Sequence, residues 1–245
     1  MKIVSLVPSI TEALFDLGLT EHEIKGRTKF CIHPADKIKN VAVIGGTKNI
    51  NIEKIKALQP DLILANKEEN VKDQVEALMN DFKVMVTHVE TIEDNYYLLK
   101  SLGKLAGKEE RAQLFNLKIY EILNQAKLRT PVKAAYLIWN NPYMTVGSDT
   151  FIHKILTEIG FENIFKDKTR YPVITTEDLK KADVIMLSSE PFPFKEKHIE
   201  ELRAFYPEKK IMIVDGEAFS WYGTHIAKCE GYFKELLEDI HAMQM

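Results

Sequence analysis

The sequence predicts an α/β fold of two lobes with parallel sheets, joined by a single long α-helix. Three observations favour this fold. Short apolar runs alternate with segments of helical spacing, the pattern of the first half recurs in the second, and an uninterrupted amphipathic segment separates the halves. With 245 residues, 45% of them hydrophobic, the chain is long enough for one large domain or two lobes.

The first half begins with a strand and a helix. The apolar run KIVSLV precedes ITEALFDLGL, in which Ile10, Leu14 and Leu17 recur at helical spacing and Gly18 ends the pattern. The elements predicted next are a helix at 51–60, a strand at 61–66, a helix at 71–82, a strand at 83–89 and helices over about 92–106. This order is typical of a parallel sheet with helices on its faces.

The second half repeats this order. A strand is predicted at 133–139 and a helix at 149–161. The segment TTEDLKKADVIMLSS then resembles IEKIKALQPDLILAN, with Asp183 in the place of Asp61, and KIMIVDG resembles KVMVTHV. Two copies of one unit predict two lobes related by a pseudo-twofold axis. Chance similarity between α/β segments remains the alternative.

The segment between the copies predicts a connecting helix. Its apolar residues Phe115, Ile119, Ile122 and Ala126 lie on one helical face, and neither glycine nor proline interrupts it before Pro131. A helix from about 107 to 128 would be roughly 33 Å long. We therefore expect an N-terminal lobe at 1–106, a backbone helix at 107–130 and a C-terminal lobe at 131–245. A rigid connector of this kind permits only small hinge motions.

The composition excludes several classes of protein. The net charge is −3 and the charges are interspersed, so no basic stripe for nucleic acid is present. No apolar run approaches the roughly 20 residues that a membrane span needs. The start MKIVSLVPS reads as a strand rather than a signal peptide, which predicts a cytoplasmic protein, or a periplasmic or cell-surface one if a signal has been removed. Two cysteines are too few for a disulfide framework.

Residues that follow the predicted strands are the candidates for a site, because ligands of parallel α/β sheets bind beyond the carboxyl ends of the strands. Both tryptophans, Trp139 and Trp221, fall in this set, together with prolines and further aromatics. Aromatic side chains facing a cleft between the lobes suit a large, flat, partly apolar ligand. The alternative is that the two tryptophans cap the ends of the lobe cores.

No catalytic motif is visible. The stretch VIGGTKN has neither the G-x-G-x-x-G nor the P-loop spacing, and no G-x-S-x-G or H-E-x-x-H is found. Glu68 and Glu69 are adjacent, so their side chains cannot both face one way in an extended segment. They either form a solvent-exposed edge of the site or make polar contacts with a ligand or a partner protein. The sequence therefore favours a binding protein over an enzyme.

The stretch KFCIHPAD places Cys31 two residues before His33, so that both side chains point to one face of an extended segment. A thiolate and an imidazole suit zinc, copper or the iron of a bound cofactor, but no second ligand pair accompanies them. We expect that the protein itself holds no metal ion. Cys31 and His33 are the only candidate metal ligands, and if they bind no metal we expect them to line the cleft.

Of the histidines, only His33 and His225 fall at the expected cleft. The other helical histidines, His22, His153, His198 and His241, are predicted to be exposed.

The chain resembles a known family over essentially its whole length. The residues that carry the resemblance are VSLVPSITEALFDLGL, VIGGTKNINIEKIKALQPDLILAN, YMTVGSDTFIHKILTEIGFENIF and FSWYGTHI. They are similar to class III periplasmic-type solute-binding proteins, the vitamin B12, haem and siderophore receptors also called helical backbone metal receptors. The stretches CIHP, GGTKN, NKEEN, EPFPF and WYG are closest to a subgroup without signal peptides.

The resemblance implies a metal chelate held between two lobes, with cobalt or iron brought by the ligand itself and no built-in cofactor. The residues expected to bind the ligand are Pro8, Ser9, Phe30, Cys31, His33, Gly46, Thr47, Asn66, Glu69, Trp139, Tyr143, Glu190, Trp221, Tyr222 and His225. Cobalamin receptors tend to have an aromatic residue at the position of Asn66. Family members dock an ABC permease through one acidic residue on each lobe, and the first-lobe position here is Lys72, with Glu69 and Asp73 close by.

The resulting hypothesis is a non-enzymatic protein that holds a corrinoid, haem or ferric siderophore and delivers it to an ABC-type importer or an intracellular acceptor. The alternative is a cytoplasmic enzyme or cofactor-handling protein of corrinoid or tetrapyrrole metabolism, in which Cys31, His33, Glu69, Glu190 and His225 are working groups. A redox or metal sensor that uses Cys31 is a third hypothesis.

Overall fold

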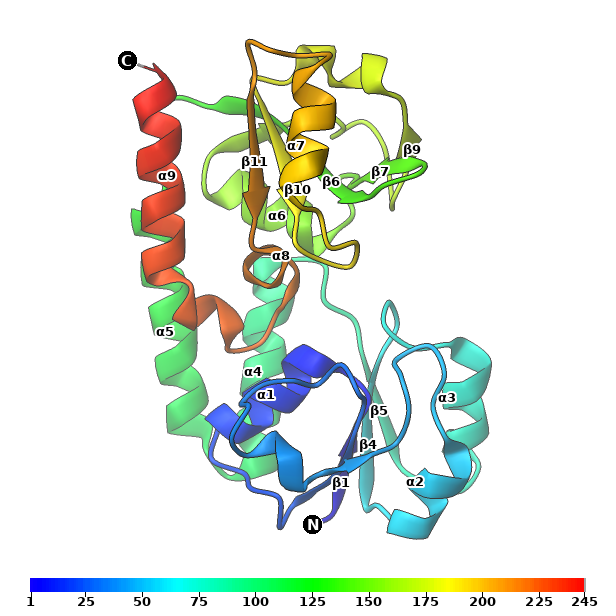
Figure 1. The fold of residues 1–245 in the computed structure, drawn as a ribbon. Coiled ribbons are helices and arrows are strands. Elements are labelled where there is room, and N and C mark those ends of the chain that lie inside the picture. The colour runs from blue at the N-terminus through cyan, green and yellow to red at the C-terminus, as the bar shows by residue number, and fades with distance from the viewer. Residues whose placement is uncertain (245) are drawn as a thin grey trace. The chain divides into compact units, whose positions relative to one another are not determined.

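The computed structural model describes residues 1–244 (Figure 1), which form two compact units. Unit 1 comprises Met1–Val89, Glu93–Leu117 and Tyr222–His225. Unit 2 comprises Glu90–Ile92, Lys118–Trp221 and Ile226 onward. A four-residue segment of the second half of the chain, Tyr222–His225, thus packs with the first half. We call this segment the strap.

Unit 1 is built on a five-stranded sheet in the order β3-β2-β1-β4-β5. The strands are β1 Ile3–Ser5, β2 Ile24–Arg27, β3 Ala42–Val43, β4 Leu62–Asn66 and β5 Val84–Thr87. Every neighbouring pair is parallel, so the predicted parallel sheet is confirmed for this unit. Strands β1 and β4 lie at the centre and are completely buried, as continuous apolar runs in a parallel sheet require.

The helices of unit 1 follow the strands in the predicted order. They are α1 Pro8–Asp16, α2 Ile52–Leu58, α3 Lys72–Met79 and α4 Ile92–Ala106. The start of α2 is set by Asn51, whose side chain accepts a hydrogen bond from the Lys54 amide at 2.9 Å. One face of α2 packs Ile55 into a core with Val4 and Ile63. Pro8 begins α1, a position where its missing N–H costs nothing.

Unit 2 has a six-stranded mixed sheet, in which β11-β10-β6-β7-β9 are neighbours and β8 pairs with β6. Its strands are β6 Val132–Trp139, β7 Tyr143–Thr145, β8 Phe161–Asn163, β9 Val173–Ile174, β10 Val184–Ser188 and β11 Lys210–Val214. The pairs β6–β7 and β7–β9 are antiparallel, which the sequence interpretation did not foresee. The chain reverses after β6 through Asn141 at φ 57°, a left-handed conformation that asparagine tolerates.

The helices of unit 2 are α6 Phe151–Glu158, α7 Glu196–Arg203, α8 Gly216–Ser220 and α9 Glu230–Gln244. A helix, α5 Glu109–Gln125, is present where the connecting helix was predicted. It is shorter at both ends than expected and is separated from α4 by Gly107 at φ 62°. Its predicted apolar face is confirmed, since Ile119 and Ile122 are buried. Within unit 2, Lys118 of α5 pairs with Glu230 of α9 at 3.9 Å.

The repeat is visible in the hydrogen bonds of the two sheets. A carboxylate oxygen of Asp61 accepts from the Lys2 amide at 2.6 Å, and one of Asp183 accepts from the Lys133 amide at 3.0 Å. In return, the Asp61 and Asp183 amides donate to the Lys2 and Lys133 carbonyls, both at 2.8 Å. Aspartates at matching places in the predicted repeat therefore tie strands together at their starts in the same way.

Candidate ligand-binding site

The loop after β2 has an exposed apolar surface over a buried thiol. Phe30 and Ile32 are 50% and 48% exposed, whereas Cys31 is completely buried. The Cys31 sulfur lies 3.1 Å from Thr11 Oγ1 and 3.2 Å from Thr28 Oγ1. Burial raises the pKa of this thiol, which opposes formation of the thiolate that a metal would need. Cys31 is thus part of the unit 1 interior.

His33 follows in the same loop and is half-buried. Its ring lies near the ring of His225, with the centroids 6.0 Å apart. Among the described residues, neither Cys31 nor His33 belongs to a group of three or more ligating side chains. The structure therefore brings His33 together with His225 rather than completing a metal site around Cys31.

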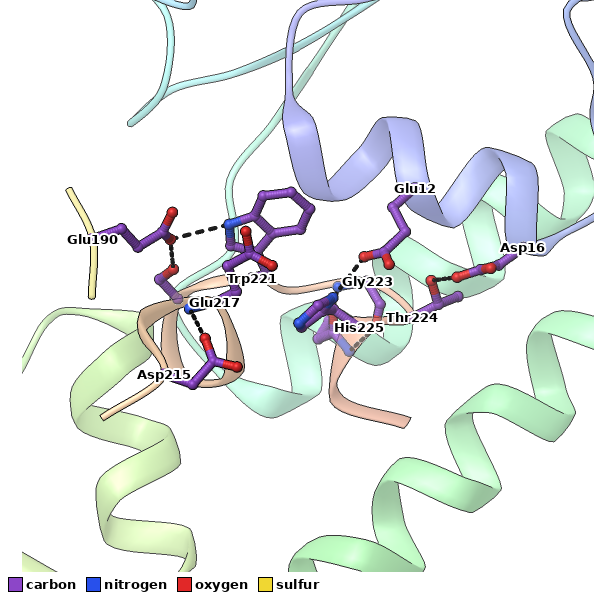
Figure 2. A network of polar contacts seen from close by, with 11 residues as sticks. Glu12, Asp16, Glu190, Asp215, Glu217, Trp221, Gly223, Thr224 and His225 are labelled. Carbon is purple, nitrogen blue, oxygen red and sulfur yellow. Dashed lines mark hydrogen bonds and ion pairs between the residues drawn. The ribbon is translucent and has the colours of Figure 1, made fainter. Parts of the chain in front are cut away.

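The strap is held to unit 1 by polar contacts with α1 and α4 (Figure 2). A Glu12 carboxylate oxygen lies 2.8 Å from His225 Nδ1, and Glu12 is only 2% exposed. The Thr224 hydroxyl donates to Asp16 at 2.5 Å. The Asn95 side chain accepts from the Gly223 amide and donates to the Gly223 carbonyl.

Sequence reasoning placed His225 at the site but missed Glu12, Asp16 and Asn95. The available signal was the spacing of Glu12 and Asp16, two acidic residues on one face of an otherwise apolar helix. Their partners, more than 200 positions away along the chain, have no signal in the sequence.

Glycine is required where the strap crosses α1. Gly223 has φ 87°, and a Cβ there would lie 3.2 Å from the Ala13 Cβ and 3.4 Å from the Ser9 carbonyl oxygen. Pro8 and Ser9 are themselves buried in the first turn of α1, and Tyr222 is buried beside Gly223 in the chain. These three predicted ligand contacts are thus mainly interior residues of unit 1.

The loops after β3 and β4 are joined by side-chain amides. Asn66 is buried, its Oδ1 accepts from the amides of Glu68 and Glu69 at 2.7 and 3.2 Å, and its Nδ2 donates to Thr87 Oγ1 at 3.2 Å. Asn70, which the sequence interpretation did not select, donates through Nδ2 to the Leu6 and Thr47 carbonyls at 3.2 and 3.1 Å.

These amides fix the backbone from which the neighbouring predicted residues project. Thr47 is buried, Glu69 is half-buried, and a Cβ on Gly46 would meet the Phe30 ring at 3.3 Å. Asn66 therefore shapes its loop, and its contact with a ligand stays a prediction.

In unit 2 the two tryptophans are not equivalent. Trp139 ends β6 and is 41% exposed, with its ring against Phe192 at 5.7 Å between centroids. Trp221 is only 7% exposed. Tyr143 packs partly against the unit 2 core, and burial raises the pKa of its hydroxyl. Trp139 therefore offers an open indole face, while Trp221 resembles the core cap that the alternative interpretation described.

Glu190 holds Trp221 in place (Figure 2). Its Oε1 accepts from the Ser220 hydroxyl at 2.7 Å and from Trp221 Nε1 at 3.1 Å. Burial raises the pKa of this carboxyl group, and the nearby Glu217 and Asp215 charges add to the rise. Gly216 permits the close approach, because a Cβ there would lie 2.5 Å from Glu190 Cγ.

Two histidines that were predicted to be exposed are buried. His153 lies on the packed face of α6 beside Asn163 at 3.2 Å, and burial lowers the pKa of its imidazole. His198 accepts at Nδ1 from the Lys195 amide at 2.8 Å in the first turn of α7. The exposure prediction was wrong for both, because helical spacing shows which residues share a face but not which face is covered.

No helix in the described part of the chain is long and apolar enough to cross a membrane.

A family model described as periplasmic binding protein matches residues 3–240. The chain belongs to this family. The resemblance inferred from the sequence motifs is therefore confirmed, as is the two-lobed α/β fold.

Relatives of this chain that carry names are binding proteins. The vitamin B12-binding protein of Salmonella typhimurium is 31% identical over 186 residues, covering 73% of this chain and 68% of the relative. An uncharacterised ABC transporter substrate-binding lipoprotein of Bacillus subtilis is 29% identical over 193 residues, covering 74% of this chain and 60% of that protein. These names favour binding over catalysis and lend nothing to the alternative of a cytoplasmic enzyme.

The fold is shared with proteins for other ligands. The crystal structure of the periplasmic haem-binding protein HutB of Vibrio cholerae superposes with a TM-score of 0.79 at 19% identity, covering 96% of this chain and 98% of HutB. At that identity the match shows the fold alone. The architecture therefore does not choose between a corrinoid and a haem.

Proposed function

We propose that this protein is a solute-binding protein that holds a metal chelate, foremost a corrinoid, for delivery to an ABC-type permease. The observation that carries the proposal is the 31% identity to a vitamin B12-binding protein over 186 residues. This match is in sequence, so it bears more closely on the ligand than a likeness of architecture does.

The surface chemistry of the described residues supports a large ligand with apolar area. Phe30, Ile32 and Trp139 are among the exposed large hydrophobic side chains, and each lies at or just beyond the carboxyl end of a strand. Covering apolar surface contributes roughly 25 cal/mol per Å². Aromatic rings add contact geometry that suits the flat face of a macrocycle.

Haem and ferric siderophores are the competing ligands. Asn66, at the position where cobalamin receptors tend to have an aromatic ring, is buried and shapes its loop. We therefore propose that a corrinoid contacts other apolar side chains, and in unit 1 this is Phe30, whose ring lies beside Gly46. The ligand is best identified by measuring how tightly the protein binds each of the three chelates.

The place of action that we propose is outside the cytoplasmic membrane. The family is described as periplasmic, and one relative is named a lipoprotein of an ABC transporter. Both favour the periplasmic or cell-surface alternative over the cytoplasmic expectation. Glu69, with Asp73 near it in the chain, is the acidic position in unit 1 that we propose for permease contact.

Titration of the purified protein with cyanocobalamin, haemin and a ferric siderophore, followed by absorbance and tryptophan fluorescence, tests the proposal. We expect cyanocobalamin to bind at micromolar concentration or below and to quench the exposed Trp139 more than the buried Trp221. The variants Trp139→Phe and Trp221→Phe separate the two signals, since the chain has only two tryptophans.

Matched substitutions test the site. Trp139→Ala and Phe30→Ala are expected to weaken binding at least about tenfold through lost apolar contact. The controls Phe205→Ala and Tyr97→Ala remove aromatic rings that are 64% and 59% exposed and that are not among the residues predicted to bind the ligand. If none of the three chelates changes either spectrum, or if the controls weaken binding as much as the site variants, the proposal is wrong.

A further inference from the structure

Three apolar side chains lie in a row across the neighbouring strands β6, β7 and β9 of unit 2 (Figure 1). Trp139 of β6 lies opposite Met144 of β7, and Met144 lies opposite Val173 of β9. Residues directly opposite each other on paired strands share a face of the sheet. Trp139 and Val173 are 41% and 58% exposed, and Met144 is half-buried. We call these three residues the apolar row. The open face of an antiparallel pairing is usually polar, so an apolar row there needs a reason.

A shift of register in β6 turns Trp139 toward this face. Leu137 lies opposite Thr145 and Trp139 lies opposite Met144, so β6 advances by two residues while β7 advances by one. In a regular ladder Trp139 would instead lie opposite Tyr143, which packs against the unit 2 core. The shift therefore directs the indole away from that core. Bulges of this kind often re-aim a side chain beside a functional site.

We propose that the apolar row contacts the flat face of a planar macrocycle, a corrinoid or a porphyrin, and selects such ligands over ferric siderophores. This inference rests on the proposed function, because it names the ligand class of the same site. It adds Met144 and Val173 to the ligand contacts. It also makes the face of the macrocycle, rather than the metal at its centre, the feature that unit 2 recognises.

The shape of the apolar row suits a planar ligand. Neighbouring strands are about 4.8 Å apart, so the row extends about 10 Å from the backbone of β6 to that of β9. Neighbouring strands are rotated by only about 20–25°, which keeps a row across three strands shallow. A planar macrocycle can touch all three side chains at once. A ferric siderophore wraps its ion in polar oxygen groups and is compact, so it would leave part of the row uncovered.

The surroundings of the apolar row are uncharged along both outer strands. The pairing of β7 with β9 continues in the same register beyond the strands, since the Thr145 amide donates to the Pro172 carbonyl at 3.1 Å. The residues two positions from Met144 and Val173 are Pro142, Val146, Tyr171 and Thr175. None of them is charged at neutral pH. An apolar ligand would therefore cover this part of the sheet without removing water from a charge.

The indole of the apolar row is held from one side. The Trp139 ring lies against the Phe192 ring with the centroids 5.7 Å apart. Phe192 packs in turn on the rings of Phe194 and His198, at 4.8 and 5.3 Å between centroids. Phe194 and His198 are buried, so this support belongs to the interior of unit 2. A side chain that is already ordered loses less conformational entropy when a ligand binds.

The test compares two planar macrocycles with a siderophore. Titrations of the purified protein with cyanocobalamin, haemin and ferrichrome, followed by absorbance and tryptophan fluorescence, give three dissociation constants. We expect at least one macrocycle to bind about tenfold more tightly than ferrichrome, because it covers more of the apolar row. The tighter of the two macrocycles then distinguishes a corrinoid from a porphyrin.

Three variants and one control assign the effect. Val173→Asp is expected to weaken macrocycle binding by about tenfold or more, Met144→Ala by about fivefold and Val173→Thr by about threefold. Ferrichrome binding is expected to stay unchanged. Val173 is 58% exposed, so its variants are expected to fold, which circular dichroism checks. Ile213→Asp is the matched control, since Ile213 is 38% exposed on β11, at the opposite edge of the same sheet. It is expected to bind like wild type.

The outcomes separate the two proposals. If wild type binds a macrocycle and the three variants bind it as tightly, the apolar row plays no part and this inference is overturned, while the proposed function stands. The same holds if ferrichrome binds more tightly than both macrocycles, or if Ile213→Asp weakens binding as much as Val173→Asp. If wild type binds none of the three chelates, the proposed function fails as well.

Discussion

The loops that follow β4 in unit 1 and β10 in unit 2 begin alike. Each strand is anchored at its start by an aspartate, Asp61 or Asp183. Each ends in a polar residue whose side chain accepts from the amide two positions on. Asn66 accepts from Glu68 at 2.7 Å, and Ser188 accepts from Glu190 at 3.4 Å. The repeat therefore extends from the strand into the turn beyond it.

The glutamates that these turns present have different surroundings. The Glu68 side chain is 22% exposed and lies 3.9 Å from His88. Glu190 is half-buried, accepts hydrogen bonds from Ser220 and Trp221, and has a raised pKa. Two loops that begin alike thus carry carboxyl groups with different surroundings, because Gly216 lets α8 approach Glu190 closely.

The largest expected effect is that of filling this space. Gly216→Ala would place a methyl group 2.5 Å from Glu190 Cγ and 2.6 Å from Ser188 Oγ. Overpacking of this kind is expected to lower the free energy of unfolding by about 1–3 kcal/mol, measured by urea denaturation. Gly231→Ala is the matched control, since a Cβ there meets nothing within 4 Å and a helical alanine is favoured. If the two variants are equally stable, the closeness of α8 does not distinguish the two turns.

The strand-end residues come next. Asn66→Ala removes buried bonds to Glu68, Glu69 and Thr87, and is expected to cost about 1–3 kcal/mol. Ser188→Ala loses bonds to Glu190 and Tyr136 and is expected to cost about 0.5–1.5 kcal/mol. Thermal or urea unfolding measures both. A larger loss for Ser188→Ala would reverse the order that the bond geometry predicts.

The pH dependence of stability separates the two glutamates. The folded-state pKa of Glu190 is raised, so the native state holds a proton over a range in which the unfolded state has released it. Stability is therefore expected to fall as the pH rises from about 4.3 through the raised value. Glu190→Gln is expected to flatten this decline, because it stays neutral and keeps an oxygen acceptor for Ser220 and Trp221.

Urea unfolding between pH 4 and 8 follows the effect, with Glu68→Gln as the control at the equivalent turn. The bonds from Ser220 and Trp221 belong to Glu190, so a smaller change in the pH profile is expected for Glu68→Gln. A wild-type profile that is unchanged by Glu190→Gln would mean that the Glu190 carboxyl group does not contribute to the pH dependence.

The smallest effects are expected at the aspartates that the two copies share. Asp61→Asn and Asp183→Asn each weaken one bond to a backbone amide at an exposed position. Each substitution is expected to cost about 1 kcal/mol or less, and the two costs should be similar and additive in the double variant. Differential scanning calorimetry detects the shifts. Clearly unequal losses would show that the repeat does not make the two strands energetically equivalent.

The sequence was informative where a pattern is local. The strands β1, β4, β5, β10 and β11, the helices α1 and α5, and the repeat were all predicted from apolar spacing and from glycine and proline positions. The antiparallel strand β7 was missed because its direction depends on a turn at Asn141 rather than on periodicity. Family membership also followed from short motifs, which the family match confirmed.

The candidate site was predicted less well, since it depends on contacts between distant parts of the chain. The stretch KFCIHPAD suggested that Cys31 and His33 act together, but tertiary packing buries Cys31 between Thr11 and Thr28 and sets His33 beside His225. In the same way, Trp139 and Trp221 both follow predicted strands and cannot be told apart from the sequence. Only the tertiary packing leaves Trp139 exposed and buries Trp221.

The sequence by itself determined the α/β order, the internal repeat and the family, because these are encoded in residue spacing along the chain. Only the tertiary structure decided that Tyr222–His225 belongs to unit 1, and that Glu12 lies at the imidazole of His225. The physical reason is that a polar side chain loses its hydration when it is buried, and a second buried polar group must compensate by pairing with it. That requirement appears only once folding has brought residues 213 positions apart into contact.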